Sequence, residues 1–327
     1  MRPPSPSVSA TPLHPPVRPV PVRGSVPAGR APAARFFRAG LGFLLVFALT
    51  AVAFVWTAPG QWLDGGLLPR AERGGGYEQP TGLVDPAKDV LAWFGDPLVL
   101  GLLLGGVLLV SAFTGRIRAG LAGTAVFGVA VLGAGLAKQV IVRPDLAVAT
   151  STTHNSFPSG HVAAAMALLL AVLLVLPARA RWWVALPGAV GVSIVAAATM
   201  VAGWHRFSDV VGAVLLAAAL FCPVAAALAR PRIRAGSGVV GPVDVALGLV
   251  GLLAALPRLF RDAGGLFVAI AGAGGLVLLV VVTVLVVVDP VEFGGSGATA
   301  PEADGYGPDR RSEPARMINR ATSAGMP

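Results

Sequence analysis

Two short polar segments of this 327-residue chain carry three of its four histidines. The first segment, residues 154–161, ends in the order Pro-Ser-Gly-His, and the second, residues 204–209, contains His205 with Asp209 four positions later. Long apolar runs lie on both sides of each segment. Because this apolar chain concentrates its few histidines in two short polar breaks, these two segments are the first candidates for a site.

The segment that ends at His161 has the composition of a helix start that binds an anion. Pro158 suits the first turn of a helix, where its missing N–H costs nothing, and Asn155 or Ser156 can cap that turn. The N–H groups of Ser159 and Gly160 would then point into the polar segment, where backbone donors and the helix dipole bind phosphate. An ordinary helix start with an incidental histidine is the alternative.

The histidines themselves suit phosphoryl transfer. His161 would lie one residue deeper than the proposed anion site, where it could protonate a leaving group. If a helix begins near His205, Asp209 lies on the same face and its carboxylate can bind one imidazole nitrogen. That bond sets the tautomer and leaves the other nitrogen free to attack. A polar pair without a catalytic role is the alternative.

A third polar segment, residues 138–145, begins with Lys138 and contains Arg143. Both cations could neutralise the oxygens of a phosphate, and both could instead be interfacial anchors that extend their charged ends into water. A metal site is not expected, because the only carboxylates near the histidines are Asp145 and Asp209, with no Glu or Cys beside them. We therefore expect no metal and no other cofactor.

The elements that position these segments are expected to be membrane helices. Hydrophobic residues make up 55% of the chain, charged residues only 13%, and the mean hydropathy is +0.76. These values exclude an ordinary soluble domain. About eight apolar stretches are long enough to cross a bilayer: 39–58, 97–114, 119–138, 160–177, 183–203, 208–229, 240–257 and 265–288.

The predicted fold is therefore all-α, a polytopic transmembrane helix bundle with a six-span core and a C-terminal helical hairpin. We divide the chain into a disordered tail (1–35), a membrane domain (36–234) with its motif-bearing core at 97–229, a two-span hairpin (235–289) and a second disordered tail (290–327). The tails are rich in Pro, Gly, Ser and charged residues and cannot bury a core.

The charge distribution predicts the orientation of this bundle. The loops after the second, fourth and sixth stretches contain arginines and no acid, whereas the other loops are mixed. By the positive-inside rule, both termini are cytoplasmic and all three polar segments face the outer side of a cell membrane. This rule and anionic headgroups account for the net charge of +9. Nucleic-acid binding is not expected, because no basic element has interleaved aromatic residues.

The three polar segments together resemble the type 2 phosphatidic acid phosphatases, membrane relatives of the vanadium haloperoxidases. The Pro158–His161 segment matches the family's second motif, and His205 with Asp209 matches the end of its third, His-x-x-x-Asp. Two positions depart from the pattern. Asp145 stands where the first motif commonly has a second arginine, and Thr199 stands where the third motif usually has one.

The resemblance implies a membrane lipid phosphatase that works through a phosphohistidine. His205 would be the nucleophile, oriented by Asp209, and His161 the general acid. The residues that would bind the phosphate are Lys138, Arg143, Ser159, Gly160 and, in place of the arginine missing at Thr199, Arg206. The implied substrate is a lipid phosphate or polyprenyl diphosphate at the outer headgroup level, with membrane lipids around the protein. The sequence does not indicate an oligomeric state.

Two other functions fit the same sequence. A lipid phosphotransferase would use the same phosphohistidine with a hydroxyl acceptor in place of water. A transporter or non-catalytic lipid-binding protein would also explain the spans. The transporter is less favoured, because transporters usually place charged groups near the middle of the membrane and contain paired repeats.

Overall fold

The structure, a computed structural model, describes residues 30–67, 82–148, 151, 154–231 and 264–293. These residues form nine α-helices, a π-helical segment η1 and two short strands. In chain order the elements are α1 (Arg30–Thr50), η1 (Ala51–Val55), α2 (Ala58–Leu67), α3 (Val84–Gly95), α4 (Pro97–Phe113), α5 (Ile117–Val140), α6 (Gly160–Val175), α7 (Ala178–Val201), α8 (Phe207–Leu228), β1 (Ala229–Pro231), α10 (Gly265–Val288) and β2 (Val291–Phe293).

The predicted all-α membrane bundle is confirmed. Five of the described helices are long and apolar enough to cross a membrane: α1 continued by η1, then α5, α7, α8 and α10. The predicted stretch 265–288 coincides with α10, and 240–257 lies outside the described residues. Helix α6 is apolar but shorter than the other candidates.

The predicted second span is half of a bent pair. Helices α3 and α4 pass the membrane test together, with a bend of 55° between them. Asp96 lies at the bend and accepts hydrogen bonds from the N–H groups of Leu98 and Val99, while Pro97 occupies the first turn of α4. A cap followed by proline starts a new helix, so the break is encoded locally.

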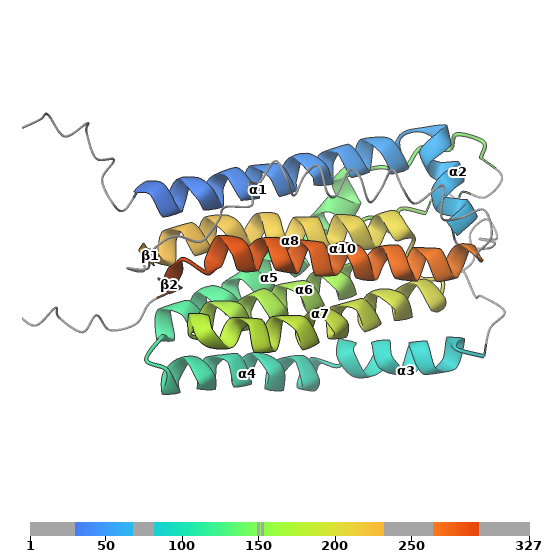
Figure 1. Cartoon of the computed structure of the whole chain (residues 1–327). Coiled ribbons are helices and arrows are strands. Elements are labelled where there is room, and N and C mark those ends of the chain that lie inside the picture. Colours follow the sequence, from blue (N-terminus) through green and yellow to red (C-terminus); the bar gives the residue numbers. More distant parts are fainter. Residues whose placement is uncertain (1–29, 68–81, 149–150, 152–153, 232–263, 294–327) are drawn as a thin grey trace, which may run out of the picture.

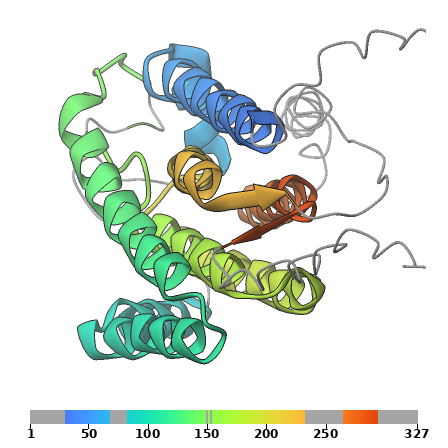
Figure 2. The ribbon, with the colours of Figure 1, turned by 90° about the vertical axis from the view of Figure 1, so that its left-hand side faces the viewer.

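Helix α8 lies in the middle of the bundle. Figure 2, which looks along the helices, shows it in the interior, between α1, α5 and α10. It contacts α1, α5, α6 and α10, and most of its side chains are buried. Its sequence is apolar on all sides, which is typical of a helix without a lipid-facing surface. The start of α8 is therefore held from several directions.

Two boundaries differ from the sequence prediction. Residues 30–35, which we assigned to the N-terminal tail, are the first residues of α1. Residues 291–293, which we assigned to the C-terminal tail, form β2 and pair antiparallel with β1. Val291 and Phe293 are buried, so burial of these apolar side chains keeps the segment on the bundle. The remainder of both tails lies outside the described residues.

β1 and β2 lie at the end of the bundle opposite α2 (Figure 1), and charged side chains pack there. Arg116 forms an ion pair with Glu292 at 2.7 Å, and the buried Arg181 donates to the carbonyl groups of Val288 and Val291. Both arginines belong to the acid-free loops whose charge predicts the orientation. Because they bind protein groups, they hold β2 and the end of α10, whereas Arg118 is exposed.

Candidate active site

All three polar segments meet at the end of the bundle where α2 lies (Figure 1). Lys138 belongs to the last turn of α5, residues 154–159 lead into α6, and His205 lies just before α8. Asn155 joins the first two segments, because its Nδ2 donates to the carbonyl oxygens of Lys138, at 2.9 Å, and of Ile141. The helices thus bring together residues that are up to about 70 positions apart in the sequence.

The predicted pair of His205 and Asp209 is formed. Nδ1 of His205 lies 3.3 Å from Oδ2 of Asp209, and both side chains are buried. His205 precedes the helix, because α8 begins at Phe207 with Arg206 as its N-cap residue. Asp209, in the first turn, reaches back to the imidazole and to the Arg206 N–H, at 2.8 Å. Nδ1 is therefore occupied, and Nε2 is the nitrogen left for chemistry.

A tight turn presents His205. The N–H groups of Trp204 and His205 both donate to the carbonyl oxygen of Thr199, at 3.0 and 3.1 Å. Gly203 lies within this turn at a φ of 71°, a conformation that residues with a side chain rarely adopt. Thr199 is fully buried and its hydroxyl donates to Ala196. The backbone carbonyl of Thr199 thus holds the turn, while its side chain is bound within α7.

The start of α6 differs from our expectation. Ser159 is the N-cap, and its hydroxyl accepts the Val162 N–H at 3.5 Å, so Pro158 precedes the cap and is not in the first helical turn. The N–H of Ser159 donates to the carbonyl oxygen of Asp209 at 3.0 Å. Ser159 thereby docks the start of α6 on that of α8. The space beside Gly160 is open, since a Cβ added there would meet nothing within 4 Å.

His161 lies among the other candidate groups. It is within electrostatic range of His205 and Lys138. Its ring centroid lies 5.8 Å from that of Trp204, and its Nε2 lies 3.2 Å from the position that a Cβ on Gly95 would occupy. The end of α3 therefore borders the site, and a glycine there leaves room for the imidazole. Sequence reasoning had not assigned α3 to the site.

The three predicted cations lie at different depths. Lys138 is half-buried and within electrostatic range of Asp209. Arg143 is only 3% exposed and donates to the hydroxyl of Ser151 at 3.3 Å. Arg206 is 1% exposed and its Nη1 donates to the hydroxyl of Ser156 at 3.0 Å. An interfacial anchor would keep its charged end in water, so that interpretation fails for both arginines.

Ser156 connects Arg206 to Asp209. Its hydroxyl donates to Oδ2 of Asp209 at 2.5 Å while it accepts from Arg206. A hydroxyl can do both at once, which places a polar bridge between the cation and the carboxylate. The loop before α6 also packs against α8 through Phe157. This ring lies so close to Gly212 that a Cβ on the glycine would be 2.4 Å from it.

Sequence reasoning missed Asp64. This residue of α2 is fully buried, and its carboxylate accepts both the N–H of Ser208, at 3.0 Å, and the Ser208 hydroxyl, at 2.5 Å. Burial, and next the charge of Asp209, raises the pKa of Asp64 to about 6. In the charge pattern of the sequence, Asp64 is only one acid of a mixed loop. No local pattern links it to a residue 144 positions later.

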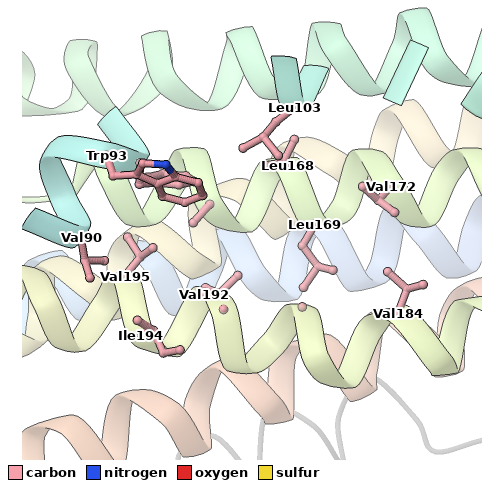
Figure 3. A pocket seen from close by; sticks show the side chains of 14 residues that line it. Val90, Trp93, Leu103, Leu168, Leu169, Val172, Val184, Val192, Ile194 and Val195 are labelled. Atoms are coloured by element: carbon pink, nitrogen blue, oxygen red, sulfur yellow. The ribbon is translucent and has the colours of Figure 1, made fainter. Parts of the chain in front are cut away.

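An apolar pocket of about 480 Å³ lies between α3, α4, α6 and α7. Figure 3 shows its lining, which includes Trp93 from α3 and Leu103 from α4. Helix α6 contributes Ala165, Leu168, Leu169 and Val172. These positions follow His161 at intervals of three and four residues, so they continue the helix face that begins at this histidine. The pocket thus extends away from the candidate site along α6.

One comparison with known proteins found a match. Residues 136–233 match the model of the PAP2 superfamily, and this segment contains every site residue that we predicted. The resemblance to type 2 phosphatidic acid phosphatases is confirmed. No curated protein and no solved structure matches the chain. The family match and the apolar helices fit a membrane-embedded phosphoryl hydrolase; α2 with Asp64, and α10, lie outside the matched segment.

Proposed function

We propose that this chain, a membrane protein with a PAP2 superfamily segment at its centre, hydrolyses lipid phosphates or diphosphates through a phosphohistidine on His205. The observation that carries this proposal is the His205–Asp209 pair with His161 as its electrostatic neighbour. Nδ1 is held by the carboxylate and Nε2 is left as a nucleophile. Two histidines and one carboxylate are sufficient for a displacement that needs a nucleophile, its orienting group and an acid.

The reaction takes two steps. Nε2 of His205 attacks phosphorus, the bond to the leaving oxygen breaks, and His161 donates a proton to that oxygen. In the second step water attacks phosphorus while His161 accepts a proton from that water. The phosphorus–nitrogen bond then breaks and inorganic phosphate is released. Asp209 stabilises the positive charge that develops on the imidazole during the first step, because its carboxylate already binds Nδ1.

The negative charge of the phosphoryl group requires nearby donors and cations. Lys138 is the half-buried cation of the site, and the Gly160 amide lies at the start of α6 with open space beside it. Arg143 and Arg206 are buried and donate to the hydroxyls of Ser151 and Ser156. We assign the direct phosphate contacts to Lys138 and Gly160. The two arginines contribute positive potential and hold the loop that precedes α6.

The apolar pocket favours a lipid substrate. It begins one helical turn after His161, so a phosphate bound at His161 would place an attached hydrocarbon chain along α6. Phosphatidic acid, phosphatidylglycerol phosphate and polyprenyl diphosphates all have this combination of a terminal phosphate and a long apolar chain. A pocket of about 480 Å³ would exclude water from the chain and orient the headgroup.

Phosphate release by the purified full-length protein tests this function. Wild type and His205→Ala are compared on these three lipid classes, with and without a chelator, and a phosphotransferase is detected by adding a polyol acceptor. His154→Ala is the matched control, because the His154 side chain is exposed at the same end of the bundle. We expect chelator-resistant release that His205→Ala abolishes and His154→Ala preserves. Full activity of His205→Ala would remove the proposed nucleophile.

We further propose that the site faces away from the cytoplasm, on the basis of the arginine distribution. Cys222 is the only cysteine and is buried, so a Cys222→Ala background allows single-site labelling. Asp145→Cys places a thiol at an exposed position of the site end, and Arg118→Cys places one at the other end. An impermeant reagent on intact cells should label the first and spare the second. The reverse pattern would invert the topology.

A further inference from the structure

The first turn of α8 receives a cap from a distant helix. Its N-cap residue is Arg206, whose side chain has no hydrogen-bond acceptor. An N-cap side chain normally accepts the N–H of the second or third residue of its helix. Here the N–H of the second residue, Ser208, donates instead to Asp64 of α2 at 3.0 Å. The Ser208 hydroxyl donates to the other carboxylate oxygen of Asp64 at 2.5 Å.

Helix α2 is itself tied to the polar segment that contains Arg143. Gln61, one turn before Asp64, donates to the carbonyl oxygens of Val55, at 2.8 Å, and Pro144, at 3.0 Å. Trp56, just before α2, donates to the carbonyl oxygen of Val142 at 2.8 Å. The position of Asp64 is therefore fixed by these hydrogen bonds of α2 and Trp56. Asp64 connects a helix bound to the first polar segment with the start of the helix that carries Asp209.

The charges around Asp64 come from the site itself. Arg206 and Asp209 face it from the start of α8, and Arg143 faces it from the segment after α5. Asp64 is 0% exposed, so its carboxylate interacts with these groups through protein and not through water. A carboxylate beside the first turn of a helix also interacts favourably with the helix dipole.

We propose that Asp64 is a positioning residue of the active site, a cap supplied by α2 that holds the first turn of α8 and thereby the geometry of His205 and Asp209. This inference rests on the proposed phosphatase function and adds to it a residue from outside the family segment. His205 and Asp209 lie three residues before and one residue after Ser208. A shift of that residue would therefore move both groups.

Ionisation of Asp64 is expected to matter for the rate. Because burial and Asp209 hold its pKa at about 6, Asp64 carries its charge at pH 7.5 and loses most of it below pH 6. Asp64→Asn keeps the shape and one acceptor for the Ser208 N–H, but it has no charge at any pH. This variant reproduces the protonated form of the wild type.

The experiment measures kcat and KM of wild type, Asp64→Asn and Asp64→Ala between pH 5 and 8, together with hydrogen exchange of the peptide that covers 204–212. We expect Asp64→Asn to lower kcat about three- to tenfold at pH 7.5, with KM within about twofold. The ratio of wild-type to Asp64→Asn kcat should fall toward one as the pH drops below 6. Asp64→Ala should accelerate exchange in the first turn of α8.

Asp89→Asn is the matched control, because Asp89 is an exposed aspartate of α3 and its replacement changes the net charge equally. It should leave kcat and exchange unchanged. A kcat ratio for Asp64→Asn that is constant from pH 5 to 8, or unchanged exchange in Asp64→Ala, would overturn the inference. The exchange measurement needs no substrate. Absence of phosphate release by the wild type would therefore count against the proposed function, and unchanged exchange in Asp64→Ala would count against the cap.

Discussion

His205 contacts Asp209 through Nδ1, at 3.3 Å from Oδ2, and the same carboxylate oxygen accepts the Arg206 N–H and the Ser156 hydroxyl. One oxygen thus joins the imidazole, the backbone of the α8 N-cap and the loop before α6. The other oxygen, Oδ1, is buried and makes no hydrogen bond among the described residues. This asymmetry makes the orientation of Asp209 depend on the three donors at Oδ2.

Asp209→Asn should give a slower enzyme and not an inactive one. The amide keeps the size of the side chain but removes the charge that stabilises a cationic imidazole, so kcat is expected to fall by about 10² or more. Pre-steady-state labelling with a ³²P-phosphorylated substrate and an alkaline quench, which preserves phosphohistidine, measures the first step. Label should accumulate more slowly in the variant. Unchanged labelling kinetics would contradict the role of Asp209.

His161→Ala should lower the rate on lipid alkyl phosphates much more than on an activated aryl phosphate. A good leaving group needs no proton, whereas an alkoxide does, and general acid catalysis is typically worth about 10² to 10⁴ in rate. The measurement is the ratio of kcat/KM for the two substrates in wild type and variant. Equal losses on both would show that His161 binds phosphate and does not act as the acid.

Arg206 and Ser156 should act as one unit, because Nη1 of Arg206 lies 3.0 Å from the hydroxyl that also binds Asp209. We expect Arg206→Gln and Ser156→Ala each to reduce kcat more than they raise KM, and the double variant to be little worse than Arg206→Gln alone. Arg206→Lys should recover only part of the loss, because an ammonium lacks the forked geometry of guanidinium. Strictly additive losses would mean that Arg206 acts independently of Ser156.

Gly191→Phe should weaken binding of long-chain substrates. Gly191 lines the apolar pocket and a Cβ there would meet nothing within 4 Å, so a larger side chain can enter the pocket without a clash at its base. KM should rise for lipid phosphates with long chains and stay unchanged for a soluble aryl phosphate. Gly101→Phe is the control, since Gly101 of α4 is equally open but does not line the pocket. Equal effects of both variants would exclude the pocket as the chain site.

Asp64→Asn should stabilise the protein at pH 8 while it slows the reaction. The pKa of Asp64 is raised from 3.8 to about 6, so the folded state prefers the protonated form. The stability that Asp64 contributes is present below pH 4 and is lost as the pH rises through 6. The charged form of Asp64 therefore costs stability at pH 8. Asparagine avoids this cost.

Thermal unfolding in detergent at several pH values measures the effect. The unfolding temperature of Asp64→Asn should exceed that of wild type at pH 8, and the two should converge near pH 4. A variant that is less stable than wild type at pH 8 would show that the charged hydrogen bonds of Asp64 outweigh its burial. A site that accepts a loss of stability for function is common in enzymes.

The amino-acid sequence by itself determined the membrane bundle and the identity of most candidate groups. Apolar length predicts a spanning helix because the bilayer has a nearly constant thickness, and the predicted stretch 265–288 matches α10. The proximity of His205 and Asp209 could likewise be predicted from their spacing, although His205 precedes α8 and Asp209 reaches back to it from the first turn. Both inferences depend only on local geometry.

Capping and chain-end boundaries were less predictable. Pro158 and Ser159 are both common near a helix start, so the sequence alone does not fix the first residue of α6. In the structure the Ser159 N–H donates to the carbonyl oxygen of Asp209, and the helix begins at Gly160. We assigned residues 291–293 to the C-terminal tail. In the structure Phe293 is buried, and the guanidinium of Arg181 lies over its ring. In each case a contact with another helix selected one of several locally possible structures.

Only the tertiary structure decided which distant groups share the site. Asp64 and Ser208 are 144 positions apart, and no spacing or composition rule connects them. The same holds for the end of α3 beside His161 and for the pocket that continues from His161 along α6. These relations follow from how the helices pack around α8. Packing depends on the summed fit of many side chains, whereas a motif records only the residues that are close along the chain.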